Sequence, residues 1–244
     1  METTSYIVLS RESGLRREMS VIAHNLANMN THGFKAERMM HVDHHVRSKS
    51  SDSMLGSKHA YVRDVASYHV PEEGPLQETG NPLDVALHSG GYFVIDTDAG
   101  PRYTRNGHFR LDDTGQLVAS NGAPVMGQGG QPIVFAPDDS EIRISQDGTI
   151  STNNGDVAKL QVATFANPHK LERETGSTYT SKEPPEETAN PMVIQGMIEG
   201  SNVNPILEMV RMIDVSRAYQ SAQKFIQRED ERIKKLGSAL VGQA

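Results

Sequence analysis

The sequence predicts an α+β fold, with an α-helix at each end of the chain and a β-rich region between them. Residues 1–30 and 201–241 carry apolar side chains at helical spacing, whereas the segment between them is rich in short strand and turn signals. Helices that stand only at the two ends of a chain can pair as one helical domain. Any apolar surface that this pair leaves uncovered is available to other subunits, so the pattern favours an assembly subunit over an enzyme.

The first helix is predicted from apolar residues at heptad-like spacing, followed by a turn signal. We expect it to start near Thr4 or Ser5, because either side chain can cap a helix. The run from Asn28 to Gly33 should end it, since Asn and Gly tolerate left-handed backbone conformations. The apolar series comprises Val8, Leu15, Met19, Ile22 and Leu26.

The middle of the chain divides into a predicted linker and a predicted β-rich region. Residues 34–60 show no clear periodicity, and the part from Arg47 to Lys58 is Ser- and Lys-rich, which is typical of a linker. The residues that follow are predicted to form short strands, including Gly91–Thr97. Asn106-Gly107 and the run from Asp112 to Gly115 are predicted to be hairpin turns.

The second helix has the clearest start signal. Asn204 is the expected N-cap, and Pro205 the expected first helical residue, where a missing N–H costs nothing. Glu208 places negative charge near the first turn, which the helix dipole favours. The helix is expected to exceed thirty residues, or roughly 45–50 Å. Its predicted apolar stripe comprises Met209, Ile213, Ser216, Tyr219, Ala222, Ile226, Ile233, Leu236 and Leu240.

The composition of the chain argues against several classes of function. A net charge of -7 argues against general nucleic-acid binding, which usually needs a basic face. The absence of cysteine is compatible with either redox compartment. No apolar run approaches the length of a membrane span, and the first residues are too polar for a secretory signal peptide. The chain is therefore expected to stay in the cytoplasm unless a signal-independent exporter carries it.

No catalytic, cofactor or metal site is predicted. His41 and His45 would share one face of a helix, with His44 beside them, but a solvated polar segment is the better interpretation because the segment has no helix signal. Asp84 is expected to cap backbone groups at a turn. The glycine-rich run at residues 127–130 lacks the lysine and helix start that phosphate binding requires.

Three motifs carry a resemblance to a known family. Ala23–Phe34 (AHNLANMNTHGF), extended by Lys35, is similar to the N-terminal signature of the bacterial flagellar rod and hook proteins. The segment from Glu199 to Pro205 resembles the C-terminal signature of the same family. The middle also agrees, at Asn81–Leu87, at Gly91-Tyr92-Phe93 and at Tyr103–Gly107.

The resemblance implies a domain arrangement. Residues 1–36 and 200–244 would form a coiled-coil domain lining the core of a hollow tube, residues 37–60 a linker, and residues 61–199 a β-rich outer domain. It also implies a structural subunit of the basal-body rod that polymerises and transmits torque. Its expected partners are other rod proteins, both proximal and distal, and the flagellar type III export apparatus. No cofactor, nucleic-acid partner or membrane insertion is expected.

Length and the middle motifs favour a proximal-rod member of the family, with a distal-rod member as the alternative. A β-domain binding module or hydrolase with helical dimerisation ends is a more distant hypothesis. Asn25 and Asn28 are either solvated helix-end residues or pair with backbone groups across a subunit boundary, and Asn202 is expected to be structural. The residues predicted to contact other subunits are Leu15, Met19, Ile22, Asn25, Leu26, Asn28, Asn202, Met209, Ile213, Tyr219 and Ile226.

Overall fold

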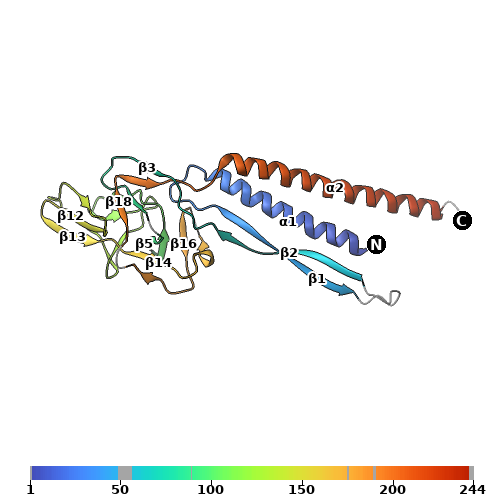
Figure 1. The fold of residues 1–244 in the computed structure, drawn as a ribbon, viewed down its shortest axis with the longest axis horizontal. Coiled ribbons are helices and arrows are strands. Elements are labelled where there is room, and N and C mark those ends of the chain that lie inside the picture. The colour runs from blue at the N-terminus through green and yellow to red at the C-terminus, as the bar shows by residue number, and fades with distance from the viewer. Residues whose placement is uncertain (1, 49–56, 89, 175, 189–190, 242–244) are drawn as a thin grey trace. The chain divides into compact units, whose positions relative to one another are not determined.

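A computed structural model describes residues 2–48, 57–88, 90–174, 176–188 and 191–241 and confirms the α+β fold class. The chain forms two compact units (Figure 1). The first unit comprises Met1–Leu26, Glu37–Ser67 and Asn204–Ala244, and the second comprises Ala27–Ala36 and Tyr68–Val203. The helical ends therefore share a unit with residues 37–67, which the predicted domain arrangement assigned to a linker and to the outer domain.

The first unit contains two long helices and a two-stranded sheet. Helix α1 (Glu2–Ala27) lies beside helix α2 (Pro205–Val241), seen in blue and in orange to red in Figure 1. The helices run antiparallel, because Asn25 near the end of α1 contacts Glu208 near the start of α2, and Arg16 contacts Tyr219 further along. The sheet pairs β1 (Glu37–Ser48) with β2 (Ser57–His69).

The start of α2 follows the prediction, whereas α1 begins earlier than predicted. Asn204 Oδ1 accepts hydrogen bonds from the N–H groups of Ile206 and Leu207, both at 3.2 Å, and Pro205 is the first helical residue. This is the N-cap arrangement expected for Asn and Pro. Helix α1 already begins at Glu2, so Thr4 and Ser5 lie inside it rather than at its cap.

The linker prediction for residues 37–60 was wrong over the described part of that segment. Residues 37–48 and 57–60 belong to β1 and β2, while residues 49–56 lie outside the described residues. A two-stranded ribbon needs little apolar periodicity, because its backbone hydrogen bonds define it. His41 and His45 therefore lie on an extended strand, roughly 13 Å apart along its axis, and not one helical turn apart.

The second unit is built on a six-stranded antiparallel sheet. Its strand order is β15 (Glu172–Arg173), β16 (Thr178–Thr180), β6 (Gly100–Thr104), β5 (Tyr92–Thr97), β14 (Val162–Thr164) and β17 (Glu186–Glu187). A three-stranded sheet joins β11 (Arg143–Ile144), β12 (Thr149–Thr152) and β13 (Gly155–Lys159).

Short strand pairs complete this unit. They are β7 (Arg110–Leu111) with β8 (Leu117–Val118), β9 (Met126–Gly127) with β10 (Gln131–Pro132), β4 (Val85–Leu87) with β18 (Val193–Gln195), and β3 (Leu76–Glu78) with β19 (Met197–Glu199). A 3₁₀ turn, η1, spans Pro168–Lys170.

Strand β5 separates two cores. Phe93 and Ile95 enter one apolar cluster, and Tyr92 and Val94 enter another, because alternate side chains of a strand point to opposite faces. Phe93 meets Phe109 edge to face, with ring centroids 5.1 Å apart. Both faces of this strand are therefore covered, which fixes its register.

One of the two predicted hairpins forms. Asp112 Oδ1 accepts from the N–H groups of Thr114 and Gln116, and the turn joins β7 to β8 as predicted. Asn106-Gly107 does not close a hairpin between adjacent strands. The Gly107 carbonyl instead accepts from the Val85 N–H at 3.0 Å, in a close approach of two backbones that a glycine permits.

Across the part of the chain that the structure describes, no helix combines the length and apolar character that crossing a membrane requires.

Candidate assembly site

The paired helices bury one face of each against the other. On α1, Ile22 and Asn25 are buried, and Leu15, Met19 and Leu26 are half-buried. On α2 the covered residues recur every three or four positions, as in a coiled-coil seam. They are Glu208, Met212, Val215, Tyr219, Ala222 and Ile226. Tyr219 and Ile226 are thus partly used inside the subunit, and this seam does not include Met209 or Ile213.

A polar network closes the end of this seam. Asn25 Nδ2 donates to the Glu37 carbonyl oxygen at 2.9 Å and to Glu208 Oε2 at 3.3 Å. Asn25 Oδ1 accepts from the Glu37 N–H at 2.9 Å. Glu208 is neutralised by Arg38 at 2.5 Å and Arg211 at 3.2 Å. Because both N–H donors of the Asn25 amide are used inside the unit, the residue ties α1 to β1 and α2.

The α2 patch is the main exposed apolar surface that the helix pair leaves open. We define it as Ile206, Met209, Val210 and Ile213, whose exposed fractions are 69%, 50%, 51% and 51%. At about 100° per residue, these side chains lie on the side of α2 opposite its seam with α1. Two predicted interaction residues, Met209 and Ile213, are therefore available for contact with another molecule. Large exposed apolar patches mark interaction surfaces.

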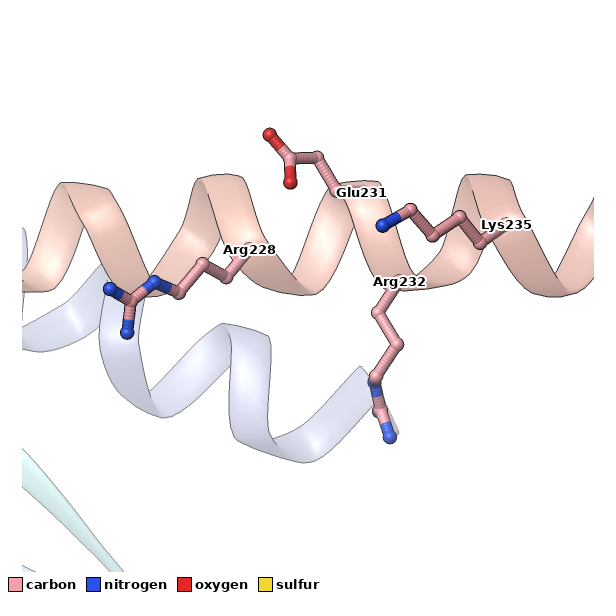
Figure 2. A pocket seen from close by; sticks show the side chains of 4 residues that line it. All are labelled: Arg228, Glu231, Arg232 and Lys235. Atoms are coloured by element: carbon pink, nitrogen blue, oxygen red, sulfur yellow. The ribbon is translucent and has the colours of Figure 1, made fainter.

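The far part of α2 is strongly polar. Figure 2 shows Arg228 and Arg232 leaving the helix on one side and Glu231 on the other, with Lys235 along the axis. Arg232 pairs with Glu229, and Lys234 pairs with Asp230 at 2.7 Å. The charged side chains keep this end of the helix solvated, so the α2 patch does not continue through it.

A second cluster, inside the second unit, joins the three sequence motifs. Lys35 Nζ lies 2.5 Å from Glu199 Oε1, and Arg105 Nη1 lies 3.1 Å from Glu199 Oε2, with all three side chains buried. Lys35 also donates to the Glu72 carbonyl at 2.7 Å. The Gly74 N–H donates to Glu199 Oε1 at 2.9 Å. We call this set, Lys35, Arg105 and Glu199, the buried ion cluster.

Burial dominates the electrostatics of this cluster. It lowers the pKa of the Lys35 ammonium from its ordinary value, because the charged form loses its water. The Glu199 carboxylate opposes that shift and the Arg105 guanidinium adds to it. The arrangement is a structural ion pair rather than a reactive lysine beside a cavity.

Asn202 and Asn28 also act within the subunit. Asn202 Oδ1 accepts from the Ala36 N–H at 2.7 Å, and its Nδ2 donates to the carbonyls of Val70 and Glu72 at 3.1 and 2.9 Å. Asn28 accepts from the Thr31 hydroxyl at 3.2 Å in the turn after α1. Asn202 thus holds the segment before α2 to residues 36, 70 and 72, and contact of Asn28 or Asn202 with another subunit stays a prediction.

Gly33 explains why the N-terminal motif carries a glycine there. Its φ is +68°, and an added Cβ would lie 2.3 Å from the Asn106 nitrogen. Its N–H donates to the Glu199 carbonyl at 2.8 Å. The three motifs therefore meet at one intramolecular junction, which sequence spacing alone could not reveal because they lie far apart in the chain.

Asp84 lies in a network of side chains at a turn. Asp84 is buried, and its Oδ1 accepts from Asn81 Nδ2 at 3.1 Å and contacts His108 Nδ1 at 2.7 Å. Both partners are side chains, so the prediction that Asp84 caps backbone groups was wrong. Asn81 Oδ1 instead accepts from the Leu83 N–H at 3.3 Å in this turn. Among the residues that the structure describes, no group of three or more His, Cys, Asp or Glu side chains is placed to hold a metal ion.

Comparisons with known proteins match the chain in three regions. "Flagella basal body rod protein" matches residues 6–35, "Flagellar hook protein FlgE/F/G D1 domain" residues 86–152, and "Flagellar basal body rod FlgEFG protein C-terminal" residues 194–239.

Relatives that are similar over most of the chain are also flagellar rod proteins. The flagellar basal-body rod protein FlgF of Caulobacter vibrioides is 34% identical over 237 residues, covering 93% of each chain. FlgF of Mesorhizobium japonicum is 34% identical over 248 residues, covering 98% of this chain and 99% of the relative. The rod protein FlgG of Buchnera aphidicola subsp. Baizongia pistaciae is 32% identical over 244 residues, covering 89% and 92%.

One unit holds paired terminal helices with an exposed apolar face, and the other is a β-rich unit closed by the motif junction. With the family matches, these features define a structural protein of the bacterial flagellar basal body. The chain belongs to the flagellar basal-body rod protein family and is an FlgF-like structural subunit of the rod.

Proposed function

We propose that this chain is a subunit of the proximal rod that polymerises through its terminal helices and transmits torque. The observation that carries the proposal is the α2 patch, in which four apolar side chains are each at least half exposed on a helix already paired with α1. In water this surface is unfavourable by about 25 cal/mol per Å² of apolar area that a neighbour would cover. Burial against neighbouring rod subunits removes that cost.

Assembly through the helices also offers a way to delay polymerisation. The terminal helices are proposed to order fully only when they dock, so that burial of their apolar side chains offsets the loss of conformational entropy. Gly14 lies in the middle of α1 and lowers its intrinsic helix stability by roughly 1 kcal/mol. Termini that resist protease in the dilute monomer would contradict this part of the proposal.

The neighbours are proposed from the relatives. Two relatives similar over nearly the whole chain carry the name FlgF, which supports a place among proximal-rod proteins with distal-rod FlgG as the next partner. The subunit would lie in the periplasmic part of a hollow helical tube, after passage through the flagellar type III apparatus without a cleaved signal. Its role would be mechanical, with no catalysis.

A distal-rod role is the second candidate. It is favoured by relatives named FlgG that are 32% identical over 244 residues. The two roles place the subunit at different heights along the rod, so one experiment separates them.

That experiment is cryo-electron microscopy of basal bodies from a strain whose protein carries a tag in residues 182–185. This segment is a suitable position because it lies just before β17 and its side chains are half-buried or exposed. Extra density between the rod base and the distal segment is expected. Density in the distal segment would favour the FlgG-like role, and a functional tagged protein absent from the basal body would refute a rod role.

A further inference from the structure

A groove lies along the flank of the helix pair. It has a volume of about 410 Å³ and is lined by Val8 and Arg11 of α1 and by Ala218, Ser221, Ala222 and Phe225 of α2. The small side chains of α2 leave space between the helices, and Phe225 adds an aromatic surface that is 44% exposed. A groove with small apolar lining can receive aliphatic side chains from another helix.

The groove and the α2 patch occupy different faces of the same helix. Counting about 100° per residue, the α2 patch points away from α1, whereas Ala218, Ser221 and Phe225 lie on the flank. Their centres are about twelve residues apart, which corresponds to roughly 18 Å along the axis of α2. The α2 patch and the groove of one subunit therefore cannot contact each other. Each of these surfaces can be contacted only by another molecule.

One pair of charges next to these two surfaces is complementary. Arg11 lines the groove, and Asp214 follows Ile213 at the border of the α2 patch. Neither side chain forms a hydrogen bond or an ion pair with any other described residue. A side chain of opposite charge on a docked subunit, facing Arg11 or Asp214, would favour docking and fix the register of the contact.

We propose that the α2 patch of one subunit docks into this groove of a second copy of the chain, with Asp214 paired to Arg11. The inference rests on the proposed polymerisation and specifies its contact. Because patch and groove are different surfaces, the contact is heterologous, and its repetition adds subunits in an open helical series instead of closing a dimer. The groove thus selects the direction of growth.

The absence of cysteine makes a direct cross-linking test possible. Differently tagged Arg11→Cys and Asp214→Cys chains are expressed together in a strain lacking its own copy, and purified basal bodies are treated with a short bismaleimide. A linker is used because an Arg–Asp pair holds two backbones further apart than a disulfide does. A heterodimer carrying both tags is expected. Arg228→Cys, on the polar end of α2, replaces Arg11→Cys in the matched control and should give none.

Charge exchange provides the second measurement. Arg11→Asp and Asp214→Arg should each cause loss of incorporation into the rod, and a chain with both changes should regain it. Incorporated chains that give no 11–214 heterodimer, or as much of the 228–214 product, would overturn this contact while leaving the rod role intact. Failure of the unmodified chain to enter basal bodies would instead refute the proposed function on which the contact depends.

Discussion

Lys35 and Glu199 form a buried ion pair although they are 164 positions apart in the sequence, with Nζ and Oε1 separated by 2.5 Å. The two residues belong to the N-terminal and C-terminal motifs, and Arg105 of the middle motif completes the cluster from the other carboxylate oxygen. The motifs that identify the family therefore close the fold of one subunit. The surface that we propose for assembly lies elsewhere, on α2.

Removing the carboxylate of this cluster should be strongly destabilising. Glu199→Gln leaves Lys35 and Arg105 buried without their counter-charge, and such a loss costs about 3–5 kcal/mol in the free energy of unfolding. Urea denaturation of the complete chain, followed by the near-ultraviolet circular dichroism of the buried tyrosines, measures it. Glu172→Gln, which removes an exposed ion pair with Lys182, is the control and should change little. Equal stabilities of the two variants would contradict the role of the cluster.

Tyr92 should make stability fall at high pH. Burial, with a smaller contribution from Tyr179, raises the pKa of Tyr92 from 10.0 to about 12. The unfolded chain therefore loses this proton first, so the stability is present below pH 10 and is lost as the pH rises toward 12. Two pKa units correspond to about 2–3 kcal/mol. Comparison of wild type with Tyr92→Phe at pH 9 to 12 tests this, and parallel curves for the two would be evidence against it.

Gly107 should tolerate no side chain. An added Cβ would lie 1.7 Å from the Val85 carbonyl oxygen, which belongs to backbone that cannot move cheaply because the two segments are hydrogen-bonded. Gly107→Ala is expected to lower the melting temperature sharply. Gly90→Ala is the control, because its Cβ meets no atom within 4 Å and its backbone is not left-handed. A Gly107→Ala protein that melts with the wild type would show that the approach is looser than described.

Local signals predicted the elements whose stability is local. The Asn204 cap followed by Pro205 and the Asp112 turn were readable because a few neighbouring side chains satisfy the backbone there. The hairpin prediction at Asn106-Gly107 was wrong because a distant contact, not a local one, determines the structure there. Its glycine is required by contact with Val85, a residue distant in sequence, and a short-range turn rule contains no information about that contact.

The predicted apolar stripe of α2 departs from the observed seam only in its first part, for a similar reason. Tyr219, Ala222 and Ile226 lie in the seam, whereas Met209 and Ile213 are exposed outside it. From the sequence, Glu208 is expected to be an exposed charge at the start of the helix. It is instead buried in the seam, because Arg38 and Arg211 neutralise its carboxylate and Asn25 donates a hydrogen bond to it. With a carboxylate in the seam, apolar residues on the opposite face form the more hydrophobic line. Two of these partners, Arg38 and Asn25, come from β1 and α1, which the sequence of the helix cannot show.

Asn25 should hold the end of α1 to the start of β1. Asn25→Leu removes both bonds to the Glu37 backbone, and the loss of a hydrogen-bond partner costs about 1–3 kcal/mol for each buried group. Faster native-state hydrogen exchange at the Glu37 amide is expected. Asn28→Ala, in the turn after α1, should leave that amide protected. Unchanged exchange in Asn25→Leu would mean that β1 is held by other contacts.

Ile213 should be needed for entry into the rod but not for folding of the β-rich unit. Its side chain is 51% exposed in the α2 patch, so Ile213→Asp leaves the helix seam intact while placing a charge where a neighbouring subunit would exclude water. Loss of the protein from purified basal bodies and loss of motility are expected, with an unchanged near-ultraviolet spectrum from the second unit. Val134→Asp makes the same chemical change at an equally exposed residue of the second unit, 51%, and should still be incorporated. Incorporation of both variants would show that the α2 patch is not the assembly surface. Exclusion of both would show that any added surface charge blocks assembly.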